Sequence, residues 1–188
     1  MILLFVGLVC SQFNNLTKNP VIYVNLDLAI DPTNMYEYVG AADHVFIGSI
    51  TKYVGNYNDE SNFIPYSKYD VKVIENIKGS LVENVQIIKN GGYNASGKLV
   101  MMESNGIEDY FPEVGIMYIF MAYSQPDGSL LLTEVNGNTK YHFENTNESE
   151  KQKLIYYDYV GNQTTFERKR YISKYARWIS VLFNLIML

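Results

Sequence analysis

The sequence predicts a mainly β protein, and three observations lead to this prediction. Residues 69–79 alternate in character, with Tyr69, Val71 and Val73 on one side of an extended segment. Residues 45–50 form a short apolar run that suits a more fully buried strand. The chain also contains 17 tyrosines, and aromatic and β-branched residues favour strands. A loop rich in Gly, Asn and Asp at 55–62 joins the two segments. We therefore expect a long antiparallel pair at the centre of the fold.

The length and composition indicate one domain with appendages. The chain has 188 residues and is 47% hydrophobic, which is enough for a real core. We divide it into an apolar leader and arm over residues 1–30, a β-barrel domain over 31–146, and a helical tail over 147–188. The bias toward Asn, Lys, Ile and Tyr is typical of an AT-rich bacterial genome.

The first ten residues are apolar but lack a positive n-region. They are too few to span a bilayer, which takes about 20 apolar residues. We interpret them as a secretory leader, with a buried strand and lipidation at Cys10 as the alternatives. Cys10 is the single cysteine, so an intramolecular disulfide is excluded. Residues 21–28 alternate and predict a first strand or an extended arm.

A short helix and further strands follow in order. Asp31 or Thr33 can cap a helix over about 33–42, since Pro32 is tolerated early in a helix. Gly-bearing turns are expected at Asn90-Gly91-Gly92 and at 125–129. The remaining expected strands are 85–89, 98–102, 115–123, 130–135 and 139–143. A short helix is expected over 151–159, and apolar residues from 165 onward recur at three- and four-residue spacing.

Charge divides the chain into an acidic body and a basic tail. Residues 1–165 carry a net charge of -9, and residues 166–188 carry +4. The acidic body argues against nucleic acid, because phosphate binding needs clustered positive charge. The tail either packs on the barrel or contacts an anionic membrane surface or a partner. The residues expected to make that membrane or partner contact are Arg168, Arg170, Lys174, Arg177 and Trp178.

No motif for catalysis, metal or cofactor binding emerges. His44 and His142 are isolated, and metal sites need clusters of His, Cys or carboxylate. Asp43 and His44 are neighbours on a predicted strand, so their side chains are expected to face opposite ways. Gly-x-Ser-x-Gly and phosphate-binding loops are absent. We therefore predict a protein without enzymatic activity, cofactor or metal.

The order of motifs resembles a known family. The segments are Ala-Asp-His-Val-Phe-Ile-Gly-Ser-Ile at 42–50, Tyr-Asp-Val-Lys-Val-Ile-Glu-Asn-Ile-Lys-Gly at 69–79, and Val-Gly-Ile-Met-Tyr-Ile-Phe at 114–120. Over residues 33–136 they resemble bacterial relatives of the netrin-like domain of tissue inhibitors of metalloproteinases. The resemblance implies an OB-like antiparallel β-barrel, and the residue patterns add a short N-terminal helix and a C-terminal helical tail. Animal inhibitors chelate the protease zinc through an N-terminal cysteine, and the barrel segment here contains no cysteine. No functional residue is therefore carried over.

These features together predict a non-enzymatic interaction module that is secreted or displayed on the cell surface. Its partner would be an unknown protein, with an anionic membrane as a further contact of the tail. The alternative, which rests on the resemblance alone, is an inhibitor or regulator of an extracellular hydrolase.

Overall fold

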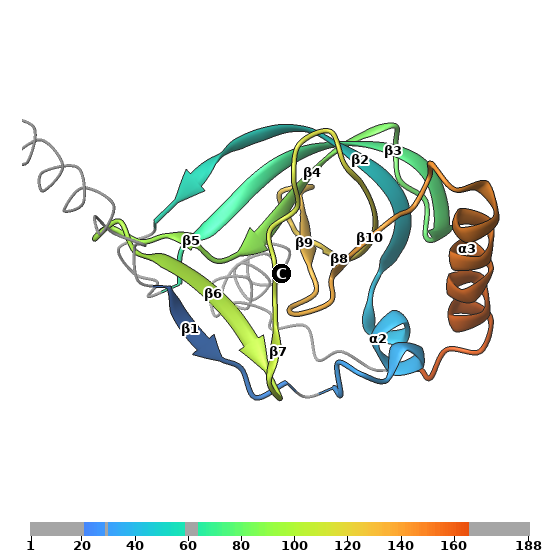
Figure 1. Ribbon diagram of the computed structural model, residues 1–188, viewed down its shortest axis with the longest axis horizontal. Helices are drawn as coiled ribbons and strands as arrows, with labels where there is room; N and C mark the ends of the chain where they lie inside the picture. The colour runs from blue at the N-terminus through green and yellow to red at the C-terminus, as the bar shows by residue number, and fades with distance from the viewer. Residues whose placement is uncertain (1–20, 29, 59–63, 166–188) are drawn as a thin grey trace, which may run out of the picture.

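The structure is a computed structural model that describes residues 21–28, 30–58 and 64–165. Its main feature is a closed five-stranded β-barrel (Figure 1). The barrel strands are β2 (His44–Tyr57), β3 (Tyr66–Lys78), β4 (Asn84–Asn90), β8 (Met117–Ser124) and β9 (Leu130–Leu132). They run in the order β8-β2-β3-β4-β9, and pairing of β9 with β8 closes the ring. The predicted OB-like barrel is confirmed, although one of its pairings, β4 with β9, is parallel.

The central pair is β2 with β3, as expected. The strands are antiparallel, and β2 continues past the predicted start of the loop at residue 55. The prediction was wrong at that end because Tyr53 pairs with Tyr69 and Tyr57 with Tyr66, which continues the ladder across Gly55. Gly48 has a packing role, since a Cβ there would lie 2.7 Å from Val71 Cγ1.

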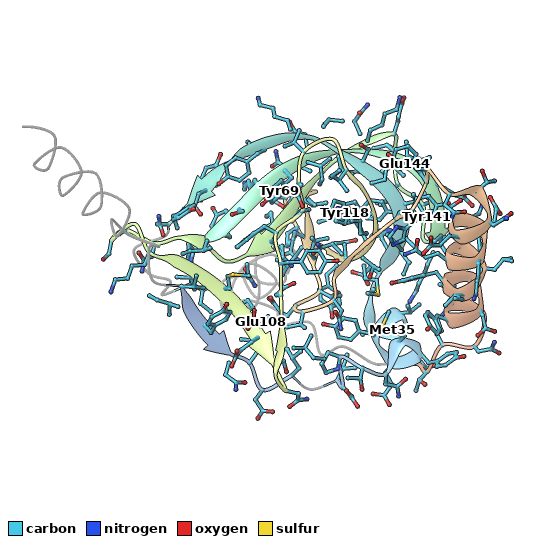
Figure 2. The ribbon with its side chains drawn as sticks, viewed as in Figure 1. Met35, Tyr69, Glu108, Tyr118, Tyr141 and Glu144 are labelled. Atoms are coloured by element: carbon cyan, nitrogen blue, oxygen red, sulfur yellow. The ribbon has the colours of Figure 1, made fainter. Side chains whose placement is uncertain are left out.

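Two apolar clusters form the core. One fills the barrel, and the other lies between the barrel wall and two helices. Figure 2 shows the side chains of Tyr69 and Tyr118, both of which belong to the first cluster. The predicted strands place seven side chains in the core, and all of them are buried: Val45, Ile47, Val71, Val73, Ile87, Tyr118 and Phe120.

The helices α2 (Met35–Ala41) and α3 (Thr146–Gly161) pack against each other beside the barrel (Figure 1). The cap of α2 is Asn34, whereas Asp31 accepts hydrogen bonds from the backbone and hydroxyl of Thr33. The helix predicted over residues 151–159 covers only part of α3, which begins five residues earlier. Its first turns are polar and are started by the Asn145 cap, so they lack the apolar spacing that marks a buried helix.

A second sheet lies beside the barrel (Figure 1). It contains β1 (Ile22–Asn25), β5 (Gly92–Tyr93), β6 (Leu99–Ser104) and β7 (Ile107–Glu108), and β1 runs parallel to β6. We call residues 91–116, which connect β4 to β8, the insertion. A turn was expected at Asn90-Gly91-Gly92, and Gly91 and Gly92, both at positive φ, carry the chain there from the barrel into the second sheet.

Two expected strands are shorter than predicted. The strand expected at 130–135 ends at Leu132, because Val135 and Asn136 adopt positive φ values of 48° and 59°. The strand expected at 139–143 is β10 (Asn138–Lys140), which pairs with β8.

Residues 1–20 and 166–188 lie outside the described residues, and so do the predicted leader and basic tail. Among the helices that the structure describes, none is long and apolar enough to cross a membrane.

Candidate functional site

A pocket of about 250 Å³ opens between the barrel and the insertion. Strands β2 and β3 form one wall, and the insertion forms the other. The lining is mostly aromatic and apolar: Tyr53, Ser67, Tyr69, Gly92, Tyr93, Leu99 and Phe111. The pocket therefore joins two segments that are separate in sequence.

Tyrosines on β2 and β3 build the barrel wall of the pocket through cross-strand pairing. The rings of Tyr53 and Tyr69 lie 5.2 Å apart, centre to centre, and are tilted by 55°. Tyr69 is buried, whereas Tyr53 is 44% exposed. Farther along the same strands, the rings of Tyr57 and Tyr66 stack 5.4 Å apart. The residues of each pair share a face because they lie opposite each other on antiparallel strands. Tyr66 and Tyr69 are three residues apart on β3, so the two pairs lie on opposite faces, and only the Tyr53–Tyr69 pair lines the pocket.

A side-chain amide holds the insertion wall in place. Asn56 Nδ2 donates to the Tyr93 carbonyl oxygen at 2.6 Å, and the Tyr93 backbone N–H donates to Asn56 Oδ1 at 2.7 Å. The amide thus pairs with Tyr93 as a neighbouring strand would. Gly92 makes this possible, because its φ is +139° and a Cβ would lie 1.9 Å from Asn56 Oδ1. The clamp leaves the Tyr93 side chain 50% exposed.

The pocket offers contact area and hydroxyl groups but no acid–base pair. Burial raises the pKa of the Tyr69 phenol, and the neighbouring Tyr53 adds to the shift, so Tyr69 stays neutral at physiological pH. Ser67 is buried and donates to the Gly91 carbonyl oxygen at 3.2 Å. Lys68 lies with the other tyrosine pair, where its Nζ is 5.2 Å from the centre of the Tyr57 ring, and it is not among the residues that line the pocket. Such a surface suits an apolar or aromatic ligand group.

The tail residues singled out from the sequence are not among those that the structure describes. Arg168, Arg170, Lys174, Arg177 and Trp178 fall outside the described residues. Within the described ranges, no group of three or more His, Cys, Asp or Glu side chains could hold a metal ion.

The two histidines have different surroundings. His44 Nε2 lies 2.9 Å from Ser124 Oγ, and the backbone N–H of Ser124 donates to Asp43 Oδ2. Asp43 and His44 thus both contact one residue across the sheet. Desolvation lowers the pKa of His44, although the Asp43 charge opposes that shift. His142 makes backbone hydrogen bonds: its N–H donates to Gln152 Oε1, and its carbonyl oxygen accepts from the backbone N–H of Asn145.

Sequence reasoning missed the pocket. The feature of the sequence that could have indicated the pocket is the high tyrosine content, but the tyrosines were interpreted only as residues that favour strands. Alternation places Tyr69 with the core side of its strand, but it does not show that Tyr53 and Tyr93 converge on it.

A search of known protein families and of curated proteins found no match to this chain.

Proposed function

We propose that this protein is a non-enzymatic interaction module of OB/netrin-like type that acts outside the cell or at its surface. It binds a protein partner through the tyrosine-lined pocket, and an apolar or aromatic side chain of the partner serves as the anchor. The observation that supports the proposal most directly is the pair of half-exposed tyrosines, Tyr53 and Tyr93, on opposite walls of an apolar pocket.

Physical chemistry favours this use of the pocket. Tyrosine supplies a large contact area at little cost in conformational entropy, and it is enriched in the binding hot spots of interfaces. No carboxylate, lysine or arginine is among the described lining residues, so an uncharged ligand group is desolvated there at little cost. The net charge of -9 over residues 1–165 disfavours a polyanionic partner.

Partner capture tests the proposal. The full-length protein is crosslinked in the native cell envelope, and the captured protein is identified and purified. Tyr53→Ala and Tyr93→Ala are then compared with wild type in direct binding. Hot-spot truncations cost about 2 kcal/mol or more, so each variant should weaken binding by at least about thirtyfold.

Tyr157→Ala is the matched control, because Tyr157 is 40% exposed and lies on α3, away from the pocket. Unchanged affinity in both pocket variants, with their melting temperatures intact, would exclude the pocket as the binding site. If the captured partner is an extracellular hydrolase whose activity falls on binding, the protein is a hydrolase regulator.

The surface location has separate tests. Fractionation of the native host should find the protein in the envelope or the medium, and protein found only in the cytosol would contradict this. Liposomes with anionic lipid should sediment the full-length chain in a salt-sensitive manner, and should not sediment a chain that ends at Thr165. Equal behaviour of both chains would remove the role proposed for Arg168, Arg170, Lys174, Arg177 and Trp178.

A further inference from the structure

Lys89 and Asp109 form a buried pair that the pocket does not use. Lys89 lies on β4, and Asp109 follows β7 in the insertion. Lys89 Nζ lies 2.6 Å from Asp109 Oδ2, and the two side chains are 2% and 3% exposed. Because removing two charges from water is expensive, a buried ion pair alone contributes little to stability.

The Asp109 carboxyl group is fixed by its other oxygen. The Tyr110 backbone N–H donates to Asp109 Oδ1 at 2.9 Å, and the Asp109 backbone N–H donates to the Met102 carbonyl oxygen at 2.9 Å. The carboxyl carbon is bonded directly to the oxygen that contacts Lys89 Nζ. The Lys89 amine nitrogen therefore lies close to the electrophilic carboxyl carbon of Asp109, and Asp109 Oδ1 already accepts the hydrogen bond from Tyr110.

A third titratable group belongs to this cluster. Glu134 follows β9, and the side-chain amide of Asn90, the residue after Lys89, donates to its carboxyl group. Lys89 and Asp109 both act on Glu134 electrostatically. Burial raises the pKa of Glu134, which favours the protonated form that donates a proton.

We propose that Lys89 and Asp109 condense into an intramolecular amide bond, with Glu134 as the proton carrier. This modification is independent of the pocket's proposed role in binding. It is a self-catalysed reaction that needs only the folded chain, with no oxidant or other co-reactant.

The condensation replaces one C–O bond of Asp109 with a C–N bond to Lys89. A proton moves from the Lys89 ammonium to Asp109 Oδ2, which leaves a neutral amine and a carboxylic acid. The Nζ lone pair attacks the carboxyl carbon, and the electron pair of the C=O bond moves to Oδ1, where the Tyr110 N–H stabilises the oxyanion. Glu134 gives its proton to the Oδ2 hydroxyl group, which leaves as water, and takes one proton from Nζ. The carbonyl re-forms on Oδ1, so the products are one amide, one water molecule and an unchanged Glu134.

Intact mass measurement of the wild-type protein, with Lys89→Met as the reference, decides the proposal. The purified full-length protein is incubated in its native state at neutral pH. We expect its mass to be lower than that of Lys89→Met by one water molecule, once the substitution itself is accounted for. A tryptic digest should contain a branched peptide that joins Lys89 to Asp109, with no cleavage after Lys89. The branched peptide distinguishes the amide from a cyclised aspartate, which also loses water.

Two further variants and one control test the mechanism. Asp109→Ala should keep its full mass. Glu134→Gln, which retains an acceptor for the Asn90 amide, should fold and form the bond at least tenfold more slowly. Wild-type protein kept in urea from the start should not react. Native wild-type protein that keeps its full mass and shows the near-ultraviolet dichroism of a folded chain would overturn the proposal, and so would water loss that persists in Lys89→Met.

Discussion

Replacing Val71 by aspartate tests the interpretation of the barrel interior most directly. Val71 lies on β3, is 1% exposed, and belongs to the apolar cluster that fills the barrel. Its neighbours in that cluster include Phe46 and Ile87. The matched control is Val71→Asn, which introduces a polar group of similar size without a charge.

The expected magnitudes follow from burial. Full burial of a valine contributes about 1.5–3 kcal/mol, and an unsatisfied polar group costs about 1–3 kcal/mol more. Val71→Asn should therefore lose about 2.5–6 kcal/mol of the free energy of unfolding. Burying an ionised Asp at position 71 costs more free energy than burying Asn there. The whole free energy of unfolding of a domain is only about 5–15 kcal/mol. At neutral pH, Val71→Asp should thus be largely unfolded or close to it.

Urea melts over a pH series provide the assay. Burial would raise the native pKa of an Asp at position 71 above its unfolded value of about 3.9. Its folded state then binds more protons than its unfolded state, so stability falls as pH rises above that value. The Asp and Asn variants should converge at low pH and diverge toward neutrality. A wild-type urea midpoint for Val71→Asp, or equal midpoints for the two variants at every pH, would refute the assignment of Val71 to a dry interior.

Three other changes have defined outcomes. Wild type should lose stability as the pH rises above about 4.3, because burial raises the native pKa of Glu134 above its unfolded value. Glu134→Gln should not show this loss, and melting temperatures measured across a pH series test both expectations. Asn145→Ala should cost about 1 kcal/mol in urea melts, since the Asn145 side chain accepts the Glu148 backbone N–H at the start of α3. Gly92→Ala should release the clamp on Tyr93 and speed hydrogen exchange of the Tyr93 amide without unfolding the barrel; unchanged exchange would show that the insertion accommodates the methyl group.

Local patterns predicted the parts of the fold that local physics determines. Alternation over 69–79 and the apolar run over 45–50 correctly gave β3 and β2, because burial alternates along β3 and is continuous over residues 45–48 of β2. The second sheet escaped prediction for the opposite reason. Its β1–β6 pairing joins residues more than 70 positions apart, and β5 and β7 are two residues each, too short for any periodicity.

The candidate site was less predictable than the fold, yet part of its neighbourhood had a signal. In the strand at 85–89, Val85, Ile87 and Lys89 share one face, so alternation alone placed a lysine on an apolar side. Such a lysine requires a buried acidic partner. That the partner is Asp109 depends on the path of the insertion, which no local pattern specifies.

The insertion links the two features that the sequence did not reveal. It carries Tyr93, Leu99 and Phe111 to one wall of the pocket, and it carries Asp109 to Lys89 on the barrel. The hydrogen bonds between Asn56 and Tyr93 fix the insertion near its first residues. The contact between Lys89 and Asp109 fixes it near its last residues. A pocket wall held at both ends loses little conformational entropy when a ligand group enters. An amide bond in place of the ion pair would make the second attachment permanent, and it would thereby preorganise the binding surface.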